Sequence, residues 1–181
     1  MAGDRTAVWS AVAGDNDWEG RVADAWASFD EYDQPAFRAL MDRLAAELAP
    51  DDPRGLFERA SARDATDQEA EAIPLYRRAL ARGLPADRRR RAVIQLASSL
   101  RNIGEPAQAA ELLTAELSGP SDELDDAVRA FLALALTDSG REREAVSVAL
   151  IALAPHLTGY ERAVGSYARL LLPAAESAES G

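Results

Sequence analysis

The side chains that usually carry chemistry are scarce in this sequence. It contains no cysteine and a single histidine, His156, which excludes a thiolate nucleophile, a disulfide framework and a metal site built from two imidazoles. It also contains no glycine-rich phosphate loop and no nucleophile elbow. The sequence therefore predicts a protein that is not an enzyme and that has no catalytic residue, no metal site and no cofactor.

One acidic cluster could in principle hold a cation. It consists of Asp122, Glu123, Asp125 and Asp126, just before an apolar stretch. Acidic residues are also favourable at the start of a helix, because they face the positive end of the helix dipole. We therefore interpret the cluster as a solvated helix start.

A basic run, Arg88–Arg91, lies in the segment 54–91, which carries ten arginines against six acidic residues. This run could bind an acidic partner or a nucleic acid. Alternatively, its arginines pair with Asp87 and with acids of neighbouring helices. No aromatic stacking platform accompanies the run, so the sequence predicts no nucleic-acid partner.

Length and overall charge narrow the class of protein further. The 181 residues carry a net charge of −11, which disfavours binding to nucleic acid or to an anionic membrane. The apolar runs are shorter than a membrane-spanning helix requires, and no secretory signal stands out. We expect a cytoplasmic protein that does not bind membranes, and its 39 alanines indicate a helical one.

Three similar segments follow one another along the chain. Their turns contain Asp67, Gly104 and Gly140, and each turn is followed by an alanine at the same distance. These alanines are Ala72, Ala109 and Ala145, and the steps between them are 37 and 36 residues. Apolar residues of helical period lie on both sides of each turn, so each segment is a helix, a short turn and a second helix.

The pattern divides the chain into helix pairs. We predict pairs at residues 17–50, 54–83, 87–118 and 122–154 and a capping helix at 159–172, in one domain over 17–173, with a flexible segment 1–16 and a disordered tail 174–181. The capping helix would turn Val164, Tyr167, Leu170 and Leu171 inward. Capping boxes are predicted at Thr66 with Glu69 and at Thr158 with Glu161. Trp18 and Trp26 belong either to the core or to an exposed docking face, and Trp9 is not assigned.

The spacing of small residues resembles a known family. Ala72-x3-Tyr76-x2-Ala79 is similar to the second helix of the tetratricopeptide repeat, and Leu96-Ala97-x2-Leu100-x3-Gly104 is similar to its first helix and turn. The resemblance covers residues 54–171 and extends to a bacterial subgroup called tetratrico peptide repeat group 5. It implies an all-α, right-handed superhelix of about four helix pairs. Two departures are Asp67, where glycine is usual, and Ala149, where a large residue is usual.

The resemblance also implies a function and a site. In this family the first helices line a concave groove that holds a peptide of a partner protein. Carried over by position, the groove residues here are Arg54, Phe57, Ser61, Asp64, Arg91, Ile94, Ser98, Arg101, Asn102, Ala127, Ala130, Leu134, Thr137 and Asp138. We expect a non-enzymatic scaffold that binds a protein or peptide, as a monomer or a homodimer. Alternatives are a self-association module, built on the Trp-bearing pair or the end helix, and a sensor of a small signalling peptide or ligand.

Arg101 has two possible roles within this groove. Asp64 and Asp138 occupy equivalent positions one repeat earlier and one repeat later, so the three residues could form a ladder of charges. Arg101 and Asn102 could grip a carboxylate or the backbone of a bound peptide. Alternatively, the aspartates neutralise Arg101, which then acts as a structural brace.

Overall fold

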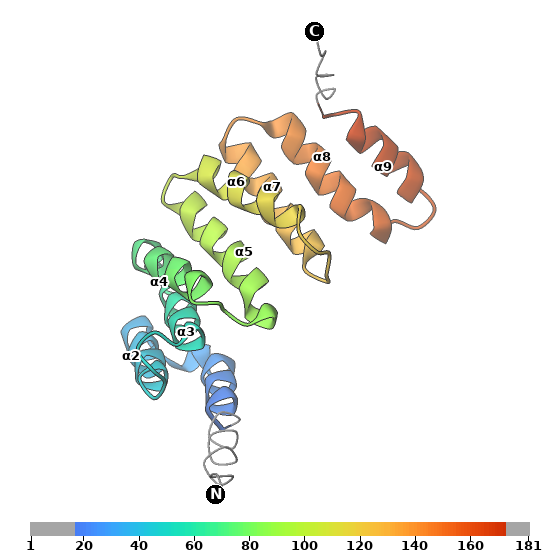
Figure 1. The fold of residues 1–181 in the computed structure, drawn as a ribbon. Helices are drawn as coiled ribbons and strands as arrows, with labels where there is room; N and C mark the ends of the chain where they lie inside the picture. The colour runs from blue at the N-terminus through green and yellow to red at the C-terminus, as the bar shows by residue number, and fades with distance from the viewer. Residues whose placement is uncertain (1–16, 173–181) are drawn as a thin grey trace, which may run out of the picture. The chain divides into compact units, whose positions relative to one another are not determined.

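The structure is a computed structural model that describes residues 17–172. The predictions for residues 1–16, including Trp9, and for residues 174–181 lie outside this range. Every regular element in the described part is a helix (Figure 1). The α-helices are α2 (Gln34–Ala45), α3 (Pro53–Asp64), α4 (Glu69–Ala81), α5 (Ala86–Asn102), α6 (Pro106–Leu117), α7 (Asp125–Asp138), α8 (Glu142–Leu153) and α9 (Glu161–Arg169). Residues 17–27 are also helical, and the 3-10 turns are η1 (Phe29–Glu31) and η2 (Ala154–His156).

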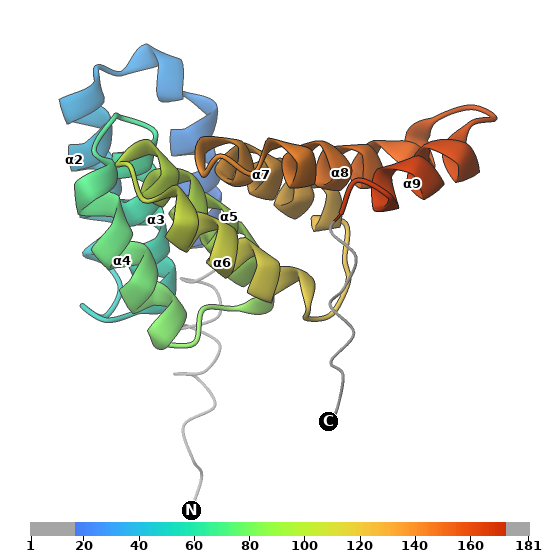
Figure 2. The same ribbon diagram turned by 90° about the horizontal axis from the view of Figure 1, so that it is seen from above.

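The helices form two compact units, the first ending at Pro85 and the second beginning at Ala86. In the first unit α2 packs against α3, and α3 packs against α4. In the second unit α5 packs against α6, and α7 packs against both of them. Helix α8 then packs against α7, and α9 packs against α8 (Figure 2). This consecutive packing of helix pairs confirms the predicted all-α fold of the tetratricopeptide type.

The three predicted turns have the same backbone geometry. Their central residues adopt positive φ, at 58° for Asp67, 88° for Gly104 and 70° for Gly140. The next amide donates a hydrogen bond to the carbonyl five residues back. These bonds run from Gln68 to Arg63, from Glu105 to Leu100 and from Arg141 to Leu136, each at 2.9 Å. Each turn therefore satisfies an end carbonyl of the first helix and reverses the chain into the second.

Both predicted capping boxes are wrong. The cap positions are Gln68 for α4 and Tyr160 for α9, and neither side chain makes a capping hydrogen bond. The two threonines lie two residues too early in the chain. Thr66 is buried, and its hydroxyl donates to the carbonyl oxygen of Ala62 at 2.7 Å, in the last turn of α3.

The aromatic residues of the N-terminal helices belong to the core of the first unit. Trp18 is buried, and its indole Nε1 donates to the carbonyl oxygen of Leu44 at 2.8 Å. Trp26 packs edge-on against Phe37, and its Nε1 donates to the buried carboxylate of Glu58 at 2.8 Å. The interpretation of Trp18 and Trp26 as core residues is therefore confirmed.

The predicted inward face of the last helix is wrong for Tyr167 and Leu170, whereas Val164 and Leu171 are partly buried. Gly165 and Ala168 are the buried residues of α9, whereas Tyr167 and Leu170 are 68 % and 72 % exposed. The physical reason is the close approach that small residues allow, because the Ser147 hydroxyl of α8 donates to the carbonyl oxygen of Ala168 at 2.7 Å. Helix α9 thus contacts α8 along its small residues and leaves its aromatic side open.

The turn geometry predicts that Asp67→Gly stabilises the first unit. A side chain at positive φ is strained, and glycine removes this strain. We expect the free energy of unfolding in urea to rise by about 0.5 kcal/mol, whereas Gly140→Ala lowers it by about 1 kcal/mol. Because the Asp67 carboxylate also accepts a hydrogen bond from Gln34 at 3.0 Å, Gln34→Ala serves as the control for its loss. A destabilised Asp67→Gly variant would contradict the prediction.

Candidate functional site

The candidate groove residues of the first unit are occupied by contacts within that unit. Phe57 and Ser61 are buried, and the ring of Phe57 lies 6.2 Å from the ring of Tyr76. The Tyr76 hydroxyl lies 3.4 Å from the Ser61 hydroxyl and 3.4 Å from the Asp64 carboxylate. Burial, followed by the nearby Asp64 charge, raises the pKa of Tyr76 far above its usual value. These side chains therefore hold α3 against α4 and offer little surface to a partner.

Arg54 also has partners in its own unit. Its guanidinium pairs with Asp52 at 3.0 Å and lies 5.6 Å from the ring centre of Trp18. The hydrogen bond from Arg54, which outweighs the opposing effect of burial, lowers the pKa of Asp52. Asp52 in addition caps α3, because it accepts a hydrogen bond from the Arg54 amide at 2.9 Å. Arg54 is thus tied to the start of its helix.

The candidate residues of α5 are more accessible. Arg91 and Asn102 are exposed and Ser98 is partly exposed, whereas Ile94 is buried. Arg91, Ser98 and Asn102 are spaced by seven and four residues, so they share one face of the helix. Helix α5 therefore carries a polar strip on one face.

The candidate residues of α7 line a hollow between α7 and α8. The hollow has a volume of about 430 Å³ and is lined by Ala130, Ala133, Leu134, Thr137, Ala145, Val146, Ala149 and Ala152. Leu134 and Val146 stand exposed at this site, and Ala127 lies nearer the start of α7, partly buried. Nearly all lining side chains are apolar and most are alanine, so the hollow suits an apolar side chain.

Sequence reasoning missed the contribution of α8 to this hollow. Val146, Ala149 and Ala152 were not among the candidate residues, although one signal could have found them. Tyr76 and Leu113 occupy the position equivalent to Ala149 in the two earlier repeats, and both are fully buried, at 0 % and 1 % exposure. Ala149 is exposed and too small to fill the same space. The missing large residue leaves the hollow open.

Arg101 forms an ion pair with Asp138, through its Nε and a carboxylate oxygen. This contact joins the ends of α5 and α7, which supports the interpretation of Arg101 as a brace. Asp64 lies in the other unit, where it contacts Tyr76. Of the predicted ladder of charges, the second unit therefore contains the pair of Arg101 and Asp138.

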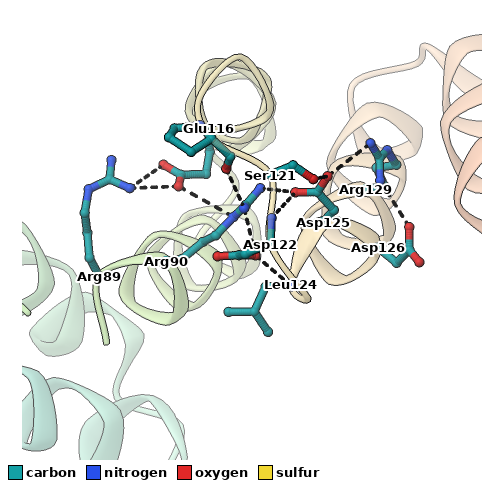
Figure 3. A network of polar contacts seen from close by, with 10 residues as sticks. Arg89, Arg90, Glu116, Ser121, Asp122, Leu124, Asp125, Asp126 and Arg129 are labelled. Carbon is teal, nitrogen blue, oxygen red and sulfur yellow. Dashed lines mark hydrogen bonds and ion pairs between the residues drawn. The ribbon is translucent and has the colours of Figure 1, made fainter. Parts of the chain in front are cut away.

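Most of the basic run is paired inside the second unit. Arg88 lies 3.3 Å from Asp87 and Arg89 lies 2.8 Å from Glu116. Arg90 is only 4 % exposed and pairs with Asp122 at 2.7 Å and with Asp125 at 2.6 Å (Figure 3). The expected pairing with Asp87 and with acids of neighbouring helices is confirmed for Arg88–Arg90, and Arg91 makes no ion pair to a residue in 17–172.

The acidic cluster is the counterpart of this arginine. Arg90 also donates to the carbonyl oxygen of Pro120 at 3.0 Å, and the Leu124 amide donates to Asp122 at 2.8 Å (Figure 3). A hydrogen bond from Ser121 lowers the pKa of Asp125 and outweighs burial, which raises it. The interaction with Arg90 lowers the pKa of Asp125 further. The guanidinium thus fastens the connection between α6 and α7, and no group of residues in the described part could hold a metal ion.

The side chain of His156 contacts the first turn of α7. Its Nε2 lies 2.9 Å from a carboxylate oxygen of Asp126. The hydrogen bond from His156 lowers the pKa of Asp126 and outweighs burial, which raises it. A hydrogen bond from Arg129 lowers this pKa as well. The imidazole thereby links η2 to the first turn of α7.

A family comparison agrees with this architecture. The profile of the tetratrico peptide repeat family matches residues 53–171, and the chain belongs to this family. No match was found among curated proteins or among solved structures. Proteins of this family are generally non-catalytic and bind other proteins. Within residues 17–172, none of the helices has the length and apolar character needed to cross a membrane.

The Arg90 network predicts a large loss of stability in Arg90→Gln. The substitution leaves Asp122 and Asp125 without their shared cation, so we expect the free energy of unfolding to fall by about 2–3 kcal/mol at pH 7 in urea denaturation. Arg91→Gln is the matched control, since Arg91 is exposed, and it should change stability by less than about 0.5 kcal/mol. Equal effects of the two substitutions would contradict this role of Arg90.

The same network predicts a pH dependence. The pKa of Asp125 is lower in the folded than in the unfolded chain, so its stabilising effect is present above the unfolded pKa of about 4 and is lost as the pH falls through the folded pKa. The difference in unfolding free energy between the wild type and Arg90→Gln should therefore narrow below about pH 4. A difference that stays constant down to about pH 2 would contradict the role of the carboxylates.

Proposed function

We propose that this chain is a non-enzymatic scaffold that binds a protein or peptide segment on the second unit, at the hollow between α7 and α8. The observation that carries the proposal is the hollow itself, because it is apolar, open and flanked by the exposed side chains of Leu134 and Val146. Membership of the tetratrico peptide repeat family supports a protein partner. An apolar side chain of the partner would replace water in the hollow.

The polar strip on α5 supports a peptide rather than an isolated apolar ligand. Helix α5 packs against α7, and Arg91, Ser98 and Asn102 supply a cation, a hydroxyl and an amide. A peptide needs such groups, because its backbone amides and carbonyls must keep hydrogen-bond partners when they leave water. Arg91 can also take a carboxylate in a forked contact. The partner we propose presents one apolar anchor and a neighbouring polar or acidic group.

The proposal predicts that Leu134→Glu weakens peptide binding. Peptides are first selected from a random-sequence display library on the immobilised chain, and their Kd is then measured by fluorescence anisotropy. A carboxylate at the mouth of an apolar hollow disfavours an apolar anchor, so Kd should rise at least about tenfold. Ile103→Glu is the matched control, because Ile103 is 47 % exposed and Leu134 is 46 % exposed. The proposal fails if no peptide is selected or if both substitutions weaken binding equally.

Two further variants test the same site by size and by charge. Ala149→Leu places a larger side chain in the hollow without introducing a charge, and it should weaken binding of the selected peptides. Arg101→Ala should lower stability and leave the Kd of the peptides within about twofold if Arg101 is a brace. A large rise in Kd for Arg101→Ala, with stability unchanged, would instead identify Arg101 as a ligand clamp.

A further inference from the structure

The second unit exposes more apolar surface than the proposed peptide site explains. Most of the exposed large apolar side chains of the described residues lie at its C-terminal end. They are Leu134, Val146, Leu153, Tyr160, Tyr167, Leu170 and Leu172. An apolar surface of this extent on a folded protein marks an interaction site.

Helix α9 presents an apolar stripe in which both tyrosines are exposed. Tyr160, Val164 and Tyr167 follow each other at helical spacing and lie on one side of the helix. Gly165 and Ala168 lie on a different side, buried against α8. Two tyrosines and Leu170, each more than two-thirds exposed, therefore project from the layer of α7, α8 and α9.

The stripe of α9 and the hollow lie on the same face of this layer. Helix α8 turns Ser147 toward α9 and Ala145 toward the hollow it shares with α7. Val146 lies between these directions, with Leu153 one heptad further along. Helix α9 is right-handed, runs back along α8 and has Ala168 against α8. With this direction and handedness, Tyr160 and Tyr167 point to the side that carries Val146. One face thus contains both an apolar hollow and projecting aromatic side chains.

We propose that this face binds a second copy of the same chain about a twofold axis. The α8 helices meet at the axis, and α9 of each copy lies over the hollow of the other. A surface that carries both a hollow and the side chains to fill it is complementary to itself, which is the condition for an isologous dimer. The tyrosines supply apolar contact at low cost in side-chain entropy.

The distribution of charge favours a second copy as the occupant. Residues 125–172 contain six acidic residues and five arginines, a net charge of −1, while the whole chain carries −11. Two copies can therefore bring this end together with little electrostatic repulsion. The overall negative charge also disfavours an anionic lipid surface as the occupant.

The available area is sufficient for a specific contact. Six exposed side chains of this face, those of Leu134, Val146, Leu153, Tyr160, Tyr167 and Leu170, offer on the order of 600 Å² per copy, given typical areas for such residues. The resulting total of about 1,200 Å² lies at the lower end of the range for stable protein interfaces. We therefore infer a dimer that dissociates on dilution.

The dimer and the peptide of the proposed function share the hollow, so they compete. Self-association can therefore regulate peptide binding at the hollow. This regulation rests on the proposed function, whereas dimerisation does not. Dimerisation itself is measured without any peptide. The absence of a dimer would overturn this inference and leave peptide binding intact, and the absence of selected peptides would do the reverse.

Sedimentation velocity of the full chain from about 1 to about 500 µM tests the dimer. The expected result is a monomer–dimer equilibrium with a Kd of about 10 µM. Tyr167→Arg should raise this Kd at least about tenfold, because it places a charge in an apolar contact. Ile103→Arg, a substitution of another exposed apolar residue in the same unit, should leave it unchanged. A wild type that stays monomeric at every concentration overturns the proposal, and so does an equal effect of the two variants.

Cross-linking gives a second readout, because the chain has no native cysteine. Val146→Cys lies near the proposed axis and should form a disulfide between two copies under mild oxidation. Arg162→Cys, on the polar side of α9, should not. Equal cross-linking of both variants would contradict the arrangement. Tight binding of the wild type to anionic phospholipid vesicles, lost in Tyr167→Arg without any dimer, would replace the second copy by a lipid surface.

Discussion

The structure depends on close contact between helices at small residues. Ala72, Ala109 and Ala145 occupy equivalent positions in the second helices and are almost completely buried. Side chains of this size let two helix backbones approach, and any larger residue there would push them apart. The turn with one residue at positive φ sets up this contact, because it reverses the chain within a few residues. Composition and architecture are therefore linked, since an alanine-rich sequence supplies the contacts that stacked helix pairs need.

One difference between the repeats is the residue four positions after each of these alanines. Tyr76 and Leu113 are buried and fill the space beside their helices, whereas Ala149 leaves that space empty and becomes part of the hollow. Helix α9 does not close the hollow, because Gly165 and Ala168 hold it against α8 instead. The proposed functions of the second unit thus arise from a local departure from the repeat pattern, on a scaffold that the pattern itself stabilises.

Sequence patterns that recur along the chain predicted the fold better than patterns that occur once. The helices and turns follow from periodicity and from Asp67, Gly104 and Gly140, which recur in register. The sequence suggested that Arg90 pairs with acidic residues of neighbouring helices. Its burial could not be predicted, because it depends on where Asp122 and Asp125 lie in space. The orientation of α9 could not be predicted, because an amphipathic helix offers its small residues and its large residues as alternative contact faces. Thr66 does not cap α4 because it lies two residues before the cap position, Gln68, and its buried hydroxyl donates to the carbonyl oxygen of Ala62.

In the proposed function, a partner peptide binds where Ala149 leaves the hollow between α7 and α8 open. Methyl NMR of the chain during titration with a selected peptide tests this binding site, with the chain concentration kept below that at which dimers form. We expect the largest chemical-shift changes at the methyl groups of Leu134 and Val146, with little change at the buried Leu56 of the first unit. The largest changes at Ile103, or at methyl groups of the first unit, would contradict it.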